Sequence, residues 1–205
     1  MLAANNPARL AHLEPYLFDA VGPHFQATGQ LAPEDFWLTL IWKANRAKNH
    51  ERRRFEKLGE CKFEEAVGRI AVALTEAGGL EERLRILMVK WGMKLPTASA
   101  VLTVLYPESF TVYDVRVCKQ LGRFEEIAKD DFSEGLWGEY RKFVAAVELA
   151  APSGLTLRQK DHYLWGLSLR DQVEADLKAP VPALKPRKKS QKNEGEAAVV
   201  SSIEP

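Results

Sequence analysis

The sequence predicts an all-α fold. Apolar residues recur every three or four positions along most of the chain, no alternating strand pairs occur, and no Asn-Gly or Asp-Gly pair marks a β-hairpin. With 205 residues and 46% hydrophobic content, the chain can bury one sizeable core. We therefore expect one helical domain over residues 1–177. Residues 178–205 are rich in Pro, Lys, Ser and Glu, which predicts a disordered basic tail.

The first half of the chain contains four expected helices. Helical spacing of apolar residues covers 7–26 and ends near Gly29, and Pro33 suits the first turn of a second helix that runs to Arg46. Two further helices are predicted over 63–77, where Gly78-Gly79 stops the pattern, and over 80–90.

A basic stretch separates the second and third of these helices. Between Lys43 and Lys57 lie seven basic residues against two acidic ones, with Trp42 and Phe55 beside them. One interpretation is a solvated surface loop. The other is a cluster that holds the phosphates of a nucleic acid.

The second half predicts four more helices, each with a defined start. One of them begins at Pro96 and is ended by Pro107. The chain then runs extended to Asp114, which is the expected N-cap of a helix over 115–121. Ser133 is the expected cap of a helix over 133–151. Thr156 fits a capping box for the last helix, in which Tyr163 and Trp165, like Trp137 before them, are expected in the core.

Composition excludes several classes of protein. The net charge is +1, and the tail holds six basic and three acidic residues, so the folded part is near neutral and a DNA footprint would have to be a local patch. Cys61 and Cys118 are too few for a disulfide framework or a cysteine zinc site, so we expect two buried thiols, no metal and no cofactor. No signal peptide or membrane span is recognisable, which predicts a cytoplasmic protein, and we expect a monomer.

The segment from Gly92 to Val117 is the most informative part of the chain. Gly92-Met93-Lys94 marks a tight hairpin between two helices, Thr97-Ala98 follows, and Asp114 comes after a short extended stretch. This order resembles the helix-hairpin-helix DNA glycosylase superfamily, and is closest to small prokaryotic members of it. The resemblance covers about 26 residues. It implies a helical domain that binds double-stranded DNA and acts on a base flipped out of the duplex.

The resemblance also assigns candidate roles to single residues. Asp114 matches the catalytic aspartate, which would activate water or stabilise positive charge on the sugar as a damaged or mismatched base leaves. The candidate DNA-binding residues are Gly92, Lys94, Thr97, Lys43 and Arg46.

Two departures from the family pattern limit the predicted chemistry. Lys94 replaces the second hairpin glycine, and Pro96 stands where bifunctional members carry a nucleophilic lysine. Without that amine no Schiff base forms at this position, so the expected reaction is monofunctional hydrolysis of the N-glycosidic bond. The sequence also lacks the cysteine cluster of the iron–sulfur members.

Alternative interpretations stay open for these residues. Asp114 can be an N-cap and nothing more, and Lys94 can be a phosphate contact, a solvated side chain or a displaced nucleophile. Trp42 and Lys43 can line a substrate cleft, or Trp42 can pack in the core. The rival function is a DNA-binding or partner-binding module that keeps the scaffold without catalysis, and a helical scaffold that binds no nucleic acid is a third alternative.

Overall fold

A computed structural model describes residues 8–180 of the chain, with side chains from Leu10 onward. Every regular element in this range is helical, so the all-α prediction is confirmed for it. The elements are α1 (Ala8–Ala11), α2 (Leu13–Tyr16), the π-helical η1 (Leu17–Val21), α3 (Gly22–Thr28), α4 (Pro33–Ala44), α5 (Lys48–Gly59), α6 (Phe63–Glu76), α7 (Leu80–Arg85), the π-helical η2 (Ile86–Lys90), α8 (Leu95–Leu105), α9 (Val115–Leu121), the 3₁₀-helical η3 (Glu125–Lys129), α10 (Glu134–Ala150) and α11 (Leu157–Lys178). Most of the predicted tail, residues 181–205, lies outside the described residues.

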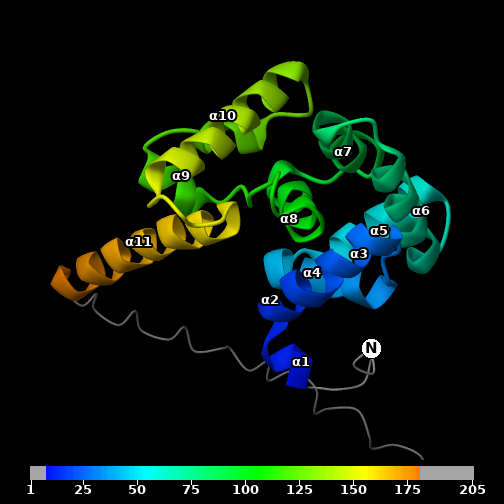
Figure 1. Cartoon of the computed structure of the whole chain (residues 1–205), viewed down its shortest axis with the longest axis horizontal. Helices are drawn as coiled ribbons and strands as arrows, with labels where there is room; N and C mark the ends of the chain where they lie inside the picture. Colours follow the sequence, from blue (N-terminus) through cyan, green and yellow to red (C-terminus); the bar gives the residue numbers. More distant parts are fainter. Residues whose placement is uncertain (1–7, 181–205) are drawn as a thin grey trace, which may run out of the picture.

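Helix α8 lies at the centre of the molecule. Every residue of α8 except Pro96 is buried, which fits its strongly apolar sequence. Helices α3, α4 and α7 pack against it, and α9, α10 and α11 form a second group of helices on its other side (Figure 1). One continuous hydrophobic core runs through both groups, which we call the N-terminal group (α1 to η2) and the C-terminal group (α9 to α11).

Three helix starts are capped as the sequence predicts. Asp114 Oδ1 accepts a hydrogen bond of 2.9 Å from the backbone N–H of Arg116 at the start of α9. Ser133 caps α10, and Thr156 forms a complete capping box with Gln159 at the start of α11. These caps satisfy backbone donors that have no partner inside the helix, and they define where each helix begins.

Two parts of the N-terminal group differ from the prediction. The expected single helix over 7–26 is broken at His12 and contains the π-helical segment η1. Pro15 and Pro23 explain this, because a proline has no N–H for the helical ladder and its ring crowds the preceding turn. From Lys48 onward the basic stretch is helix α5 rather than a loop, whereas Lys43 belongs to α4 and Arg46 to the turn between them. Phe55 anchors α5 in the core.

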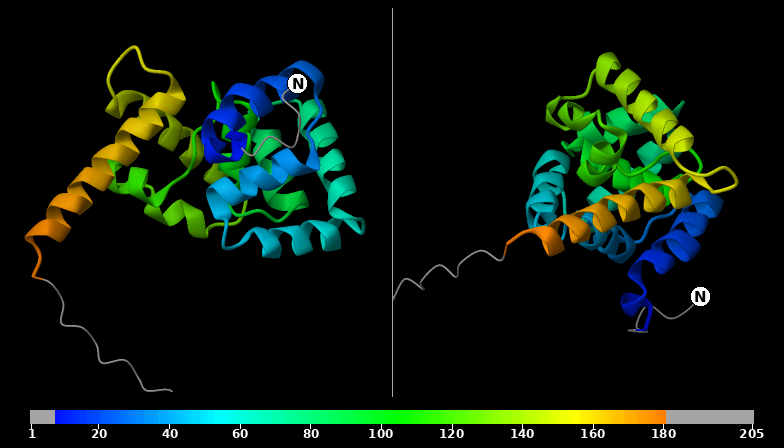
Figure 2. Two further views of the ribbon diagram at one scale, coloured as in Figure 1. Left: turned by 90° about the horizontal axis from the view of Figure 1, so that it is seen from below. Right: turned by 90° about the vertical axis from the view of Figure 1, so that its left-hand side faces the viewer.

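Three aromatic residues expected in the core are not buried. Tyr163 and Trp165 are exposed on α11, and Trp137 is half-buried. The buried face of α11 consists of Leu157, Asp161, Leu164 and Ser168, and Tyr163 and Trp165 lie outside this face. The far end of α11 extends away from the other helices (Figure 2). Of the two cysteines, Cys118 is buried as expected and Cys61 is only half-buried.

None of the helices between Ala8 and Lys178 combines enough length with enough apolar character to cross a lipid bilayer.

Candidate functional site

The hairpin between η2 and α8 is held by glycine geometry and by α5. Gly92 has φ = +66°, and a Cβ atom built on it would lie 2.8 Å from Cδ of Arg54. The same Arg54 donates a hydrogen bond of 2.7 Å from Nη1 to the carbonyl oxygen of Gly92. A larger residue at position 92 would therefore be strained and would displace the arginine that attaches the hairpin to α5.

The other two hairpin candidates differ in exposure. Lys94 immediately precedes α8, and its exposed ammonium lies 2.9 Å from a carboxylate oxygen of Asp131. Thr97 is buried in the first turn of α8, and its backbone N–H donates to the carbonyl oxygen of Lys94. Lys94 is therefore accessible to a phosphate, whereas Thr97 serves the helix start.

A rigid extended segment connects α8 to Asp114. The backbone N–H of Tyr113 donates to Ser99 Oγ on α8 at 2.9 Å, and the hydroxyl of Tyr113 donates to the carbonyl oxygen of Phe124. Two residues earlier in the segment, the carbonyl oxygen of Thr111 accepts a hydrogen bond of 2.7 Å from the hydroxyl of Tyr140. These bonds attach the extended segment to α8 on one side and to α10 on the other, so they define the position of Asp114 relative to α8.

Asp114 forms an ion pair with the predicted DNA-binding residue Lys43. Nζ of Lys43 lies 2.8 Å from Oδ2 of Asp114, and the two side chains are 17% and 24% exposed. Burial alone would raise the pKa of Asp114, but the Lys43 ammonium and the N–H of Arg116 lower it overall below its ordinary value. The carboxylate is therefore ionised at neutral pH, which is the form a general base requires.

The Asp114–Lys43 pair opens into a cavity of about 550 Å³. This volume is within the range of ordinary small-ligand sites. The cavity lies between the two groups of helices, because α2 and α4 supply one wall and the residues around Asp114 together with α11 supply the other. The lining residues are Glu14, Trp42, Lys43, Val112, Asp114, Arg158, Asp161, His162 and Trp165.

A charged network of side chains from α2 and α11 also lines the cavity. Oε1 of Glu14 lies 2.6 Å from the guanidinium of Arg158 and 2.5 Å from Nε2 of His162. Burial alone would raise the pKa of Glu14, but the hydrogen bond from His162 and the charge of Arg158 lower it to about 2. Glu14 is consequently a permanent anion at physiological pH.

The same arginine also holds a second carboxylate. Arg158 pairs with Asp161, which is almost fully buried. Burial raises the pKa of Asp161 to about 6, because the single guanidinium is shared with Glu14 and compensates only part of the lost hydration.

Aromatic rings complete the cavity. Trp42 packs edge-on against Phe18 with ring centroids 5.6 Å apart, and the guanidinium of Arg158 lies over both rings. On the opposite wall, the guanidinium of Arg116 lies 5.6 Å from the ring of Trp165. The indoles are therefore positioned by packing and by cation–π contacts, with the polar edge of Trp42 directed at Glu14.

Comparisons with known proteins give no match. No family model matches the chain, and no curated protein or solved structure matches it. The helix-hairpin-helix resemblance therefore depends on the motif residues alone.

The basic stretch contributes cations on the outside of α5. Arg46 follows α4, and Arg53 and Lys57 lie four residues apart on one face of α5; none of these three exposed side chains has an acidic partner among residues 8–180. We call them the unpaired cations. Other exposed basic residues, such as Arg69, Arg85 and Lys129, each pair with a glutamate three or four residues earlier, and we call these the paired cations.

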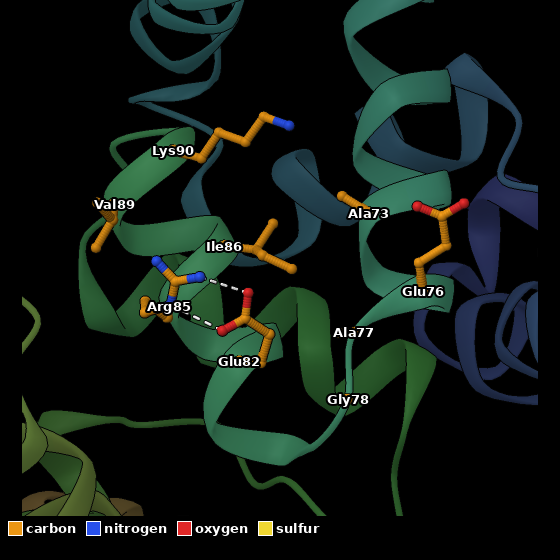
Figure 3. Close-up of a pocket in the computed structure, with 9 residues that line it drawn as sticks. All are labelled: Ala73, Glu76, Ala77, Gly78, Glu82, Arg85, Ile86, Val89 and Lys90. Carbon is orange, nitrogen blue, oxygen red and sulfur yellow. Dashed lines mark hydrogen bonds and ion pairs between the residues drawn. The ribbon is translucent and has the colours of Figure 1, made fainter.

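A second hollow of about 610 Å³ lies between α6 and the α7–η2 helix pair. Figure 3 shows that Arg85 and Glu82 face each other there, and Nη2 of Arg85 lies 2.5 Å from Glu82 Oε1. Ile86 and Ala73 form part of its apolar lining. Glu76 and Lys90 also line this hollow, and neither forms an ion pair among the residues that the structure describes.

Neither metal nor thiol chemistry has a clear place in the site. Within residues 8–180 no three His, Cys, Asp or Glu side chains are grouped as a metal ion would require. The thiol of Cys118 is buried, and this burial raises its pKa to about 11, so it stays protonated.

The sequence indicated part of the cavity lining, on both walls, and gave no indication of the rest. Glu14, Arg158, Asp161 and His162 were not singled out as site residues, yet all four line it. A signal was present: Arg158, Asp161, His162 and Trp165 follow the i, i+3, i+4, i+7 spacing of one helix face. Because a charged face is ordinarily the solvent side of a helix, this spacing alone does not identify a site; the burial of Asp161, which the structure shows, does.

Proposed function

We propose that this protein is a monofunctional DNA N-glycosylase that uses Asp114 to excise a damaged or mismatched base from double-stranded DNA. The observation that carries the proposal is that Asp114 is only partly buried and borders a cavity large enough for a flipped nucleoside, close to Lys43 and Trp42. An N-cap residue with no other role does not need such a cavity in front of it.

The chemistry follows from the state of this carboxylate. A water molecule bonds to C1′ of the flipped nucleoside as the C1′–N bond breaks, its proton passes to Asp114, and the departing base takes a proton from solvent. The ionised carboxylate also stabilises the positive charge that develops on the sugar. Lys43 favours the ionised form, and the N–H of Arg116 fixes the orientation of the carboxylate.

The surface charge supports duplex DNA as the partner. The unpaired cations and the exposed ammonium of Lys94 are available to phosphates. Extrusion of a base costs a few kcal/mol and is cheapest at damaged or mismatched positions, which favours such bases as substrates.

The test is excision from a panel of duplexes that carry damaged or mismatched bases, with alkali treatment to break the strand at abasic sites. The wild-type protein is expected to produce alkali-sensitive breaks, and Asp114→Asn to lose them. Strand cleavage without alkali, or a borohydride-trapped adduct that disappears in Lys94→Ala or Lys43→Ala, would contradict the monofunctional assignment.

The alternative function is a DNA-binding module without catalysis. The observation that favours it is the ion pair itself, since Lys43 donates to Oδ2 of Asp114 and the N–H of Arg116 donates to Oδ1, so both carboxylate oxygens already have a partner in the protein. Salt-dependent duplex binding with no excision of any base in the panel would support this alternative.

A further inference from the structure

The cavity contains a second carboxyl group besides Asp114. Asp161 on α11 also lines the cavity, and its side chain is 4% exposed. Its Oδ2 atom accepts a hydrogen bond from Nη1 of Arg158, whereas Oδ1 has no hydrogen-bond partner among the described residues. The polar side-chain atoms in this part of the chain that are both fully enclosed and without a partner belong to Trp91, Thr111 and Arg158. Oδ1 of Asp161 is not among them, so this oxygen is accessible from the cavity.

The two carboxyl groups differ in how tightly they hold a proton. Burial raises the pKa of both, but at Asp114 the ammonium of Lys43 outweighs burial and the pKa is lowered overall. At Asp161 burial dominates over the charge of Arg158 and raises the pKa to about 6. Asp161 thus exchanges its proton close to neutral pH, where a general acid is most effective. Carboxyl groups with opposite pKa shifts in one cavity are typical of a paired base and acid.

The titratable groups that act on Asp161 come from each element packed around it. They are Arg158 and His162 on α11, Lys43 on α4, Asp114 before α9 and Tyr140 on α10. Lys43 donates to Asp114, and burial raises the pKa of Tyr140, whose hydroxyl donates to a backbone carbonyl. His162 is half-exposed and its Nε2 already contacts a carboxylate. We therefore treat His162 as the rival proton donor that the experiment has to separate from Asp161.

The predicted reaction has a use for a proton donor. Cleavage of the N-glycosidic bond leaves an electron pair on the base. A neutral base departs as an anion unless it receives a proton, whereas the cationic 7-methylguanine departs as a neutral molecule and needs none. Solvent can supply the proton, but a positioned acid accelerates such a step by typically about 10²–10⁴-fold. A carboxyl group with one oxygen open to the cavity is suited to this transfer, because its protonated form donates one O–H.

We propose that Asp161 is the general acid of the excision reaction, and that it passes a proton from Oδ1 to the departing base while Asp114 accepts one from the attacking water. This inference rests on the proposed glycosylase function and adds a second catalytic residue to the same cavity. As the C1′–N bond breaks, its electron pair stays on the base, the base takes the proton of Asp161, and the carboxylate left behind pairs with Arg158. Solvent then returns a proton to Asp161 and removes one from Asp114, so the net reaction consumes one water molecule.

The experiment compares neutral and cationic leaving bases. Duplexes carry uracil, hypoxanthine or adenine as the neutral base, or 7-methylguanine as the cationic one, each opposite an abasic-site analogue so that flipping is easy. Single-turnover excision rates are measured from about pH 4 to about pH 8 for the wild-type protein, Asp161→Asn, His162→Gln and Glu51→Gln. Glu51 is the matched control, because it is 5% exposed, pairs with an arginine three residues away and does not line the cavity.

The wild-type rate on neutral bases should fall about tenfold per pH unit above the pKa of Asp161 of about 6, whereas the rate on 7-methylguanine should not. Asp161→Asn should excise neutral bases about 10²–10⁴-fold more slowly and lose this pH dependence, because an amide has no acidic proton. Its rate on 7-methylguanine should change only a few-fold. Glu51→Gln should keep both the wild-type pH profile and the wild-type ratio of neutral to cationic excision, since any effect of this change on folding or DNA binding falls on both classes of base.

Several outcomes overturn the inference and leave the glycosylase function standing. Equal losses on both classes of base in Asp161→Asn would show a structural role, and a loss confined to neutral bases in His162→Gln but not in Asp161→Asn would assign the acid to His162. A wild-type protein that excises only 7-methylguanine needs no acid. If only neutral bases are excised, or if Asp161→Asn does not fold, the pH profile decides: a fall above about pH 6 supports the inference, and a flat profile overturns it.

Absence of excision of every base by the wild-type protein is a separate outcome. It would overturn the glycosylase function, and the inference with it, because no departing base would then need a proton.

Discussion

Replacement of Asp114 separates its structural role from its chemical one. Asparagine is as good an N-cap as aspartate, so Asp114→Asn keeps the bond to the N–H of Arg116 and loses the charge. Asp114→Ala loses both. The half-buried pair with Lys43 contributes on the order of 1 kcal/mol, and the cap contributes about 1 kcal/mol more. Unfolding in urea should therefore show losses of about 1 and about 2 kcal/mol.

Activity and acid sensitivity complete this experiment. Both variants should lose excision by about 10²–10⁴-fold, because neither has a carboxylate. The pKa of Asp114 is lowered in the folded protein, so its stabilising effect is present above the unfolded-state pKa of about 3.9 and is lost as the pH falls through the lowered value. The stability gap between wild type and Asp114→Asn should close in acid.

The results that would refute this reasoning are specific. Wild-type excision by Asp114→Asn would show that the carboxylate has no part in the chemistry. Equal stability of the asparagine and alanine variants would show that the cap contributes nothing. A gap that persists unchanged to low pH would remove the ion pair as its cause.

Three further predictions concern DNA binding, the hairpin and a buried acid. Replacing the three unpaired cations with glutamine should reduce the slope of log K against log salt in a duplex-binding titration by about 3, whereas the same change at the paired cations should leave it nearly unaltered. Gly92→Ala should cost clearly more stability in urea than Gly122→Ala, because both glycines have φ = +66° but only the first would place its Cβ 2.8 Å from Arg54. Asp161 has a raised folded-state pKa of about 6, so wild-type stability should fall by on the order of 2 kcal/mol between about pH 4 and pH 6 in pH-dependent unfolding, and Asp161→Asn should flatten this fall.

The parts of the fold that the sequence predicts are those set by local interactions. The caps at Asp114, Ser133 and Thr156 each depend on residues two or three positions away, and all three are confirmed. Pro33 likewise opens α4 as expected. Helix α5 could not be predicted from the basic stretch in this way, because it has few apolar positions and only Phe55 among them is fully buried.

The cavity could not be predicted in the same way, because its contacts join distant parts of the chain. Lys43 and Asp114 are 71 positions apart, and Glu14 and Arg158 are 144 apart. Helical periodicity reports which face of one helix is apolar, but it carries no information on which two faces meet. The motif around Asp114 indicated a candidate residue; its partner and its surroundings come from tertiary packing.

The division of the cavity between the two groups of helices also has a consequence during protein synthesis. Glu14, Trp42 and Lys43 are made early, while Arg158 and Asp161 are added only when most of the chain has left the ribosome. An incomplete chain thus has Glu14 and Trp42 but lacks Arg158, whose guanidinium contacts both side chains. The cavity is therefore complete only once α11 has been made and has packed against the earlier helices, so a chain that ends before Arg158 lacks part of its lining.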